Sequence, residues 1–498
     1  MKPDVVIIGG GVAGLACGCY LQMNGYRTQI LEMNDAPGGL CVAWDRGPYR
    51  FDGCLRWLAG TNPDTLFYRI WRELGGINGQ EIRHQDEFLR VEGREGEVLR
   101  VTADLDQLAR DCKQLSPADS RRIDELVRAA RRCASLDAPE NAMELMTIRE
   151  KMAMMRQYLP MLWTVGTWMG RPVSAYAAGY HSRFLREVVM GLAGHPRMSS
   201  LVLVMMLGWR SRKNAGCIVG GSRVFTQGIA ARYERLGGVF RFNSAAVSIQ
   251  VENGRAAGVH CADGTYLPAA DVVSCADAHT TIFKMLGERY VNRKVRHLYE
   301  KFEVFPGLLQ VSLGIDCSFP DAPHGLSLPL SRPIRVDDVT SHDRFEIGIF
   351  AADSGLCPAG KTIMLVRMFS RYEYWAHLRE QRPADYTEAK ESLIREIVGI
   401  LDQRFPGVAA HLEQSDLATP ATFQRFSGNW QGSFQGWLPT PRSLGKRLPR
   451  SLPGLKNFYL AGHWLDPGGG IPQAAMSGRY VAQMICARDG KKFTSTTA

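Results

Sequence analysis

The sequence predicts an α/β protein with two domains, one built on a parallel sheet and the other an α+β domain of a sheet and helices. Two glycine-rich segments, near residues 9–14 and 468–472, each lie between a strand pattern and a helix pattern. With 498 residues, of which 45% are apolar and 22% charged, the chain is too long for one core and apolar enough to bury more than one.

The first element is a short strand over residues 5–8, a continuous β-branched run typical of a parallel strand covered on both faces. The glycines that follow fit G-x-G-x-x-G, a pattern that provides a tight turn, close approach of a diphosphate and close helix packing. A helix over residues 12–24 then directs its first amides and its positive dipole end at the phosphates. The predicted phosphate-binding residues are Gly9, Gly11, Val12, Ala13 and Gly14.

Gly25 ends this helix, and residues 27–31 form the second predicted strand, with Glu32 at its tip. A carboxylate at this position accepts hydrogen bonds from a ribose and repels a 2′-phosphate, which favours FAD or NAD over NADP. Together, the first 32 residues predict a Rossmann-type dinucleotide site.

The segments Pro37-Gly38-Gly39 and Tyr49-Arg50-Phe51-Asp52-Gly53 come next. With the first motif, they resemble the FAD-binding fold shared by amine oxidases, phytoene desaturases, carotenoid isomerases and retinol saturases. The resemblance implies FAD as the cofactor, with the backbone of Gly38 and Gly39 close to its flavin side. Where that family usually has arginine after the glycine pair, this chain has Leu40, which implies the loss of a phosphate or flavin contact.

The middle of the chain predicts a helix from Gly220 to about Leu236, strands over 239–242, 246–251 and 271–275, and a hairpin turn at Asp263-Gly264. In the resembling family this block returns to the FAD domain. A residue at the position of Val247 then lies against the adenine through backbone hydrogen bonds.

Near the end, residues 457–463 predict a strand, followed by a glycine-rich turn and a helix to about Arg488. Such a turn presents backbone amides to the pyrimidine edge of a flavin. This segment and residues 432–437 look like the C-terminal signature of the desaturases, isomerases and saturases, except that His463 replaces the acid that holds the ribityl chain. The flavin contacts expected here are Gly462, His463, Gly470, Ile471 and Pro472.

We therefore assign residues 1–90, 216–300 and 425–490 to the Rossmann-type FAD-binding domain, and 91–215 and 301–424 to the substrate-binding domain. The second insert contains strand patterns at 308–315, 345–350 and 362–369, which predict a sheet that roofs the flavin. The first insert is mostly helical and has two apolar stretches, 152–170 and 188–209. They either line an apolar tunnel or enter one membrane leaflet, or they are ordinary buried helices.

The resemblance implies an FAD-dependent desaturase or dehydrogenase that acts on a long apolar isoprenoid or lipid-like substrate, with hydride transfer to flavin N5. Four alternatives stay open: a saturase or a carotenoid-type isomerase using reduced FAD, an amine oxidase, and a non-enzymatic prenyl-binding escort or GDP-dissociation inhibitor. No catalytic residue is assigned, because in flavin chemistry the protein contributes position, dryness and electrostatics. The electron acceptor is not predicted.

Composition narrows the class of partner. Twelve scattered cysteines without a CxxC or HExxH motif are typical of a reduced cytoplasmic protein and predict no metal site. The net charge of +10 comes without a nucleic-acid-binding motif, so nucleic acid is excluded, whereas peripheral contact with the inner face of a membrane stays open. We expect no membrane-spanning helix, since no uncharged apolar run reaches the needed length.

Overall fold

The computed structural model describes residues 3–498, and a parallel sheet of five strands forms its first layer. The strands are β1 (Val5–Ile8), β2 (Thr28–Leu31), β10 (Val239–Arg241), β14 (Asp271–Ser274) and β20 (Phe458–Leu460). Their order is β10-β2-β1-β14-β20, and every neighbouring pair is parallel. The predicted α/β class and the predicted central strand are confirmed, because β1 is buried between two parallel neighbours.

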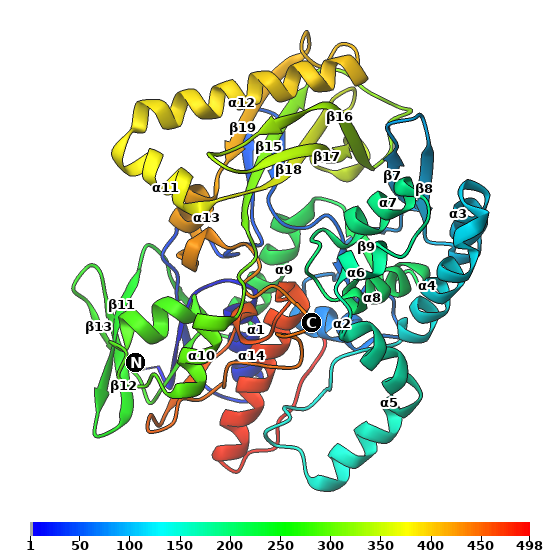
Figure 1. Cartoon of the computed structure of the whole chain (residues 1–498). Coiled ribbons are helices and arrows are strands. Elements are labelled where there is room, and N and C mark those ends of the chain that lie inside the picture. The colour runs from blue at the N-terminus through cyan, green and yellow to red at the C-terminus, as the bar shows by residue number, and fades with distance from the viewer. Residues whose placement is uncertain (1–2) are drawn as a thin grey trace.

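Three helices cover this sheet, namely α1 (Val12–Met23), α9 (Gly221–Arg235) and α14 (Gly470–Arg488). The first and the last lie side by side although they come from opposite ends of the chain (Figure 1). A Cβ atom added to Gly478 would lie 2.4 Å from the carbonyl oxygen of Ala13, so the two helices need a residue without a side chain at this crossing. Both ends of the chain therefore join one core.

A mixed sheet of seven strands forms the second layer. Its strands are β7 (Glu87–Glu92), β8 (Val98–Thr102), β15 (Gly307–Ile315), β16 (Gly325–Arg335), β17 (Ser341–Phe350), β18 (Thr362–Ser370) and β19 (Leu412–Ala418). The order is β19-β15-β18-β17-β16-β7-β8. The predicted strands at 308–315, 345–350 and 362–369 are confirmed as β15, β17 and β18. The other four were not predicted, because polar residues or Pro329 interrupt their apolar pattern.

One face of this second sheet packs against α12 (Pro383–Arg404), which lies across it at the top of Figure 1. Apolar residues of both elements, among them Val311, Val366 and Leu401, are fully buried there. The opposite face points toward the first layer, where β4 (Tyr49–Asp52) contacts it. Two shorter helices, α11 (Tyr372–Gln381) and α13 (Pro420–Ser427), pack beside it.

Helices dominate the first insert, as predicted. They are α3 (Leu105–Leu115), α4 (Ser120–Cys133), α5 (Ile148–Met169), α6 (Val173–Ala177), α7 (Arg183–Ala193) and α8 (Ser200–Ser211). The apolar stretch 188–209 forms ordinary buried helices, with Val188, Leu203 and Val204 in the core. The stretch 152–170 is not buried in this way. It belongs to α5, which projects from the body of the molecule (Figure 1), and most of the apolar side chains of this helix are exposed.

Short elements complete the fold. The predicted turn at Asp263-Gly264 lies in an antiparallel sheet of three strands, and two small sheets flank the first layer. Their strands are β11 (Ala246–Glu252), β12 (Arg255–Cys261), β13 (Tyr266–Pro268), β3 (Ala43–Arg46), β5 (Leu58–Ala59), β6 (Ile82–Arg83) and β9 (Ala215–Ile218); the remaining helices are α2 (Leu66–Leu74) and α10 (Arg293–Lys301). In the part of the chain that is described, no helix is long and apolar enough to cross a bilayer.

Candidate cofactor and substrate site

The glycine motif after β1 and the glycine pair that follows β2 lie against each other. The backbone of Gly11 bridges that of Gly38, and the Gly38 N–H donates to the carbonyl of Gly10 at 2.9 Å. A Cβ atom on Gly39 would lie 3.1 Å from the Cα of Gly11. The two motifs therefore form one cradle of bare backbone, of the kind that admits a diphosphate closely.

Helix α1 is held tightly against the turn that precedes it. Gly9 has φ +99°, a conformation that glycine adopts without strain, and a Cβ atom on Gly14 would lie only 2.0 Å from the Gly9 carbonyl oxygen. Val12 and Ala13 are buried in the first turn of α1. Their backbone N–H groups belong to the free amino end of the helix, where an anion is stabilised.

Glu32 lies at the end of β2 and is 4% exposed. Its Oε2 accepts a hydrogen bond from the Gly10 N–H at 2.8 Å, and its Oε1 accepts from the N–H and the Nδ2 of Asn34 at 3.0 and 2.8 Å. Each carboxylate oxygen has two lone pairs, so Oε2 keeps one for a ribose hydroxyl. The acid thus stands beside the cradle in an orientation fixed by backbone donors.

Val247 is half-exposed and lies at a bulge in β11, between the ladder pairs of Ala246 and Ser248. A bulge leaves its extra residue outside the ladder, so its backbone groups are free for another partner. Ser244, three residues before Val247, contacts the backbone of Glu32, because the Ser244 N–H donates to the Glu32 carbonyl at 2.8 Å. Val247 is therefore held close to the end of β2.

The C-terminal glycine segment folds around His463. The Gly462 N–H donates to the Ser477 hydroxyl at 2.7 Å, and the Nε2 of Gln435 donates to the carbonyl of Gly468 at 2.6 Å. A Cβ atom on Gly436 would lie 3.2 Å from the Cδ2 of His463. Gly470, Ile471 and Pro472 follow as the first turn of α14, so the residues predicted for the flavin end lie together.

His463 has a buried Nε2 without a hydrogen-bond partner among the described residues. Burial lowers the pKa of its imidazole to about 4, so the ring is neutral at neutral pH. A neutral ring nitrogen in this position needs a polar partner from outside the protein, because an unpaired buried polar atom is costly. FAD fits this requirement.

The two glycine clusters meet at one short segment after β14. A Cβ atom on Gly9 would lie 3.3 Å from the Ala276 nitrogen, and one on Gly462 would lie 3.7 Å from the Cys275 carbonyl oxygen. The parallel order of β1, β14 and β20 causes this, since it places the carboxyl ends of all three strands at the same edge. This arrangement fits FAD, while each individual contact with the cofactor stays a prediction.

Leu40 and the second sheet form an apolar wall beside the flavin end. Leu40 and Phe434 pack against a small apolar cluster of Leu308, Ala418 and Phe423. The Phe434 ring stacks with that of Phe369 on β18, with their centroids 6.3 Å apart. The leucine that replaces arginine after the glycine pair thus extends an apolar surface.

A row of polar side chains crosses the same face of the second sheet. Gln310, Arg367, Glu346 and Ser327 are direct neighbours across β15, β18, β17 and β16. The Nε2 of Gln310 donates to the carbonyl of Asp52 at 3.0 Å, and the Nε of Arg367 donates to the Oε1 of Gln310 at 2.9 Å. Sequence reasoning missed this row, although a local sign was a polar residue in apolar surroundings, as Gln310 is in β15 and Arg367 in β18.

Two further arginines lie near this row. Arg56 follows β4, and its Nε lies 3.8 Å from a Cβ atom added to Gly348 of β17. Arg210 ends α8 with its guanidinium carbon 3.9 Å from the ring centroid of Phe88 and 5.1 Å from that of Trp57. Burial, and then repulsion from Arg56, lowers the pKa of Arg367 to about 10.

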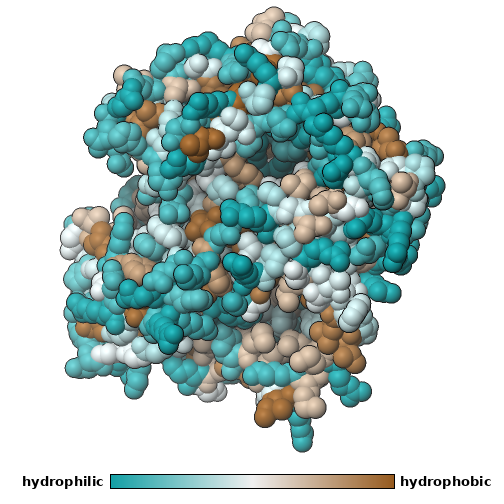
Figure 2. All heavy atoms as spheres, viewed as in Figure 1, coloured by the Kyte–Doolittle hydropathy of each residue, from teal (hydrophilic) through white to brown (hydrophobic). Residues whose placement is uncertain are grey.

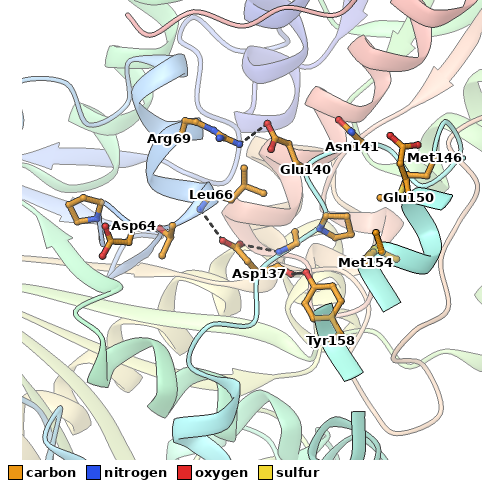
Figure 3. A pocket seen from close by; sticks show the side chains of 15 residues that line it. Asp64, Leu66, Arg69, Asp137, Glu140, Asn141, Met146, Glu150, Met154 and Tyr158 are labelled. Atoms are coloured by element: carbon orange, nitrogen blue, oxygen red, sulfur yellow. Dashed lines mark hydrogen bonds and ion pairs between the residues drawn. The ribbon is translucent and has the colours of Figure 1, made fainter. Parts of the chain in front are cut away.

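A cavity of about 620 Å³ lies elsewhere, between the start of α2, the segment before α5, and α5 itself (Figure 3). Its lining mixes apolar side chains, such as Leu66, Met146 and Met154, with polar groups. The Tyr158 hydroxyl donates to the carbonyl of Asp137 at 2.9 Å, and Arg69 pairs with Glu140 at 2.6 Å. None of the predicted site residues lines it. It separates α5 from the body instead of enclosing a reaction centre.

Comparisons with known proteins place these features in context. A sequence profile described as flavin containing amine oxidoreductase matches residues 12–486. A lycopene-forming phytoene desaturase from Paracoccus is 25% identical over 96% of both chains, and the chloroplastic prolycopene isomerase of Daucus carota is 22% identical over 97% of this chain and 80% of its own. Among solved structures, cyclohexylamine oxidase from Brevibacterium oxydans has a TM-score of 0.61 at 16% identity, covering 99% of this chain and 100% of its own.

Proposed function

The chain belongs to the flavin-containing amine oxidoreductase family and is an FAD-dependent oxidoreductase, and from this premise we propose that it removes two hydrogens from a long apolar isoprenoid chain. Family membership argues against the non-enzymatic prenyl-binding alternative. The likeness to phytoene desaturases and prolycopene isomerases favours the polyene branch over amine oxidation.

The observation that carries the proposal is the apolar wall formed by Leu40, Leu308, Phe369 and Phe434. Phe434 directly precedes Gln435, whose side chain holds the glycine turn of the flavin end. A hydrocarbon bound against this wall would lie next to the flavin. It would displace water from the wall, because apolar side chains form no hydrogen bonds that hold water there. An amine substrate would need polar partners, which on this sheet face come from the neighbouring row with Gln310 and Glu346 and not from the wall itself.

When bound, FAD supplies an acceptor for a hydride at N5. The protein would position one carbon of the chain within about 3.5 Å of that atom, which is the geometry of a near-attack complex. The stacked pair Phe369 and Phe434 is suited to hold a flat conjugated segment, since aromatic faces pack well on such groups. The Gln310 amide, fixed by Asp52 and Arg367, keeps the nearby strand in register.

The test is anaerobic reduction of the FAD-loaded protein by phytoene in detergent. We expect bleaching of the oxidised-flavin band and a product lighter by two hydrogens. Phe434→Ala should slow bleaching about tenfold through lost packing, whereas Phe426→Ala, at an exposed ring, should not. Reduction by primary amines but by no polyene would overturn the proposal.

Isomerisation is the second candidate, favoured by the matches to prolycopene isomerases. In that case a cis-polyene would change its double-bond geometry, without a change of mass, only after the flavin had been reduced. Chromatography of the products with oxidised and with reduced flavin separates the two activities.

The proposal includes attachment of α5 to the cytoplasmic face of a membrane. Figure 2 shows apolar side chains at the lower edge of the molecule, where α5 projects. They form one stripe along the helix, and cationic residues accompany them at Arg149, Lys151 and Arg156. This combination suits an anionic lipid surface. The exposed apolar residues of the stripe are Ile148, Met152, Met155, Leu159, Leu162 and Trp163.

Vesicle sedimentation tests this attachment, using phosphatidylcholine with and without phosphatidylglycerol. Trp163 is 83% exposed, so Trp163→Ser should leave stability unchanged but weaken vesicle binding about tenfold. Val339→Ser, at an apolar residue exposed elsewhere, is the matched control. If the stripe instead mediates pairing of two copies, the variant will change the molecular mass in solution and not the sedimentation.

A further inference from the structure

Three arginines beside the apolar wall have no carboxylate partner. Arg56, Arg210 and Arg367 form no ion pair with any residue of the described part of the chain, whereas Arg344 on the same sheet pairs with Glu187 at 2.8 Å and Arg404 pairs with Glu92. The Nε of Arg210 is buried without any hydrogen-bond partner. All three side chains are only partly accessible.

Arg56 acts electrostatically on each of the other two cations. Burial lowers the pKa of Arg210 to about 10, and repulsion from Arg56 contributes to this shift. His324 feels the same charges: burial, then Arg56 and Arg210, lower the pKa of its imidazole to about 4. The shared influence of Arg56 agrees with the contacts that place Arg56 beside Gly348 of β17 and Arg210 beside Phe88 of β7, along the same sheet.

The nearby acids balance these charges only in part: Glu346 attracts Arg56 and Asp52 attracts Arg367, whereas no carboxylate of the described residues acts on Arg210. Glu346 accepts a hydrogen bond from Ser327 at 2.5 Å, and burial raises the pKa of its carboxyl. Asp52 is occupied by the Ser222 N–H and hydroxyl and by the amides of Cys54 and Leu55. The local excess of positive charge is costly without a ligand, because an unpaired charge in protein is poorly solvated.

The cationic groups are also held in place. The Gln310 side chain accepts a hydrogen bond from the Arg367 guanidinium. The guanidinium of Arg210 lies over the rings of Phe88 and Trp57. Arg367 and Phe369 are two residues apart on one strand, so they share the face of the sheet that carries the apolar wall. One surface therefore offers an aromatic part for a chain and a cationic part for a charged end.

We propose that Arg56, Arg210 and Arg367 bind an oxyanionic end group, a carboxylate or a phosphate, carried by the apolar substrate. This rests on the proposed function, because it places the charged end relative to a chain that is held at the flavin. The planar guanidinium donates paired hydrogen bonds that match both oxyanions. The preferred substrate is then an isoprenoid acid or phosphate ester, and a plain hydrocarbon such as phytoene binds the same wall more weakly.

Ligands of equal chain length test the proposal: geranylgeranic acid, geranylgeranyl phosphate and geranylgeraniol, titrated into the FAD-loaded protein and followed by the flavin difference spectrum. The acid or the phosphate should bind about ten- to a hundredfold more tightly than the alcohol, as expected for charge-assisted hydrogen bonds. The better of the two identifies the head group. Arg56→Gln and Arg367→Gln should remove this preference, and Arg332→Gln, at an exposed arginine of the same sheet, should keep it.

Equal binding of all three ligands overturns the proposal. A second outcome also overturns it: an arginine variant changes the reduction potential of the ligand-free flavin but still binds the anionic ligands more tightly than the alcohol. The arginines would then act on the flavin and not on the substrate. A stability measurement separates a structural role: Arg210→Met should raise the Tm of the ligand-free protein, since it removes an unpaired charge, and a lower Tm contradicts a ligand site. Tight binding of an acid that never reduces the flavin supports the anion site while rejecting dehydrogenation.

Discussion

The two sheets of this protein build binding surfaces in different ways. The parallel five-stranded sheet offers backbone: Gly9, Gly11, Gly39 and Gly462 stand at the ends of its strands with no side chain in the way. The seven-stranded sheet offers side chains, such as Gln310 and Arg367, from the face that points toward the first layer. Its other face packs an apolar core against α12.

The difference teaches what each surface can recognise. A backbone cradle approaches a diphosphate closely and depends on the absence of Cβ atoms, so it suits an invariant cofactor. A row of side chains on a pleated sheet can change residue by residue without altering the fold, so we propose that substrate choice resides there. The cofactor end should therefore fail by steric clash, and the substrate end by lost charge or lost packing.

The largest effect is expected at Gly14. In Gly14→Ala the added Cβ would meet the Gly9 carbonyl oxygen at 2.0 Å, so α1 must move away from β1. We expect a loss of about 3 kcal/mol in the free energy of unfolding, with little bound flavin. Urea unfolding and the flavin content of the purified protein measure this.

Gly166→Ala is the control for Gly14, since a Cβ atom there meets nothing within 4 Å and alanine favours a helix by about 1 kcal/mol. Normal stability and flavin content in Gly14→Ala would show that the cradle does not depend on bare backbone, and the contrast between the sheets would fail.

A smaller effect is expected at Glu32. Glu32→Ala removes the acceptor of the Gly10 N–H and the expected partner of the ribose. FAD should bind about ten- to a hundredfold more weakly, as for loss of hydrogen bonds to a charged group. Flavin fluorescence during titration of the apoprotein reports this affinity. Asp35→Ala, at an exposed acid nearby, should leave the affinity unchanged, and equal loss in both variants would point to a general charge effect.

The effect that is smallest near neutral pH, and that grows only as the pH falls, comes from the buried histidines. Burial lowers the pKa of His195, His279, His324 and His463 from 6.5 to about 4. Between these values the unfolded chain binds protons that the folded chain does not, so stability is complete above pH 6.5 and is lost as the pH falls toward 4. Urea unfolding of the ligand-free protein at several pH values should show this slope.

His324→Gln tests the second sheet by itself, because it removes the titrating imidazole on which Arg56 and Arg210 both act. Its slope between pH 6.5 and 4 should be shallower than that of the parent protein. An unchanged slope would mean that His324 titrates normally and that the cations of Arg56 and Arg210 do not reach it.

The sequence by itself determined the cofactor half. Gly9 to Gly14, Glu32 and Gly462 to Pro472 could be predicted as a cofactor site because each motif consists of neighbouring residues: a strand end, a turn without Cβ atoms and a helix start are encoded locally. The central strands β15, β17 and β18 followed from the same kind of local apolar pattern.

Only the tertiary structure decided the rest. Arg56, Arg210 and Arg367 come from a loop, a helix and a strand far apart in sequence, and strand register and helix packing bring all three to the second sheet. In the same way, α5 and α8 are both apolar, yet one is exposed and the other buried. Local pattern fixes which face of an element is apolar, but the partner that covers it is set by contacts between distant segments.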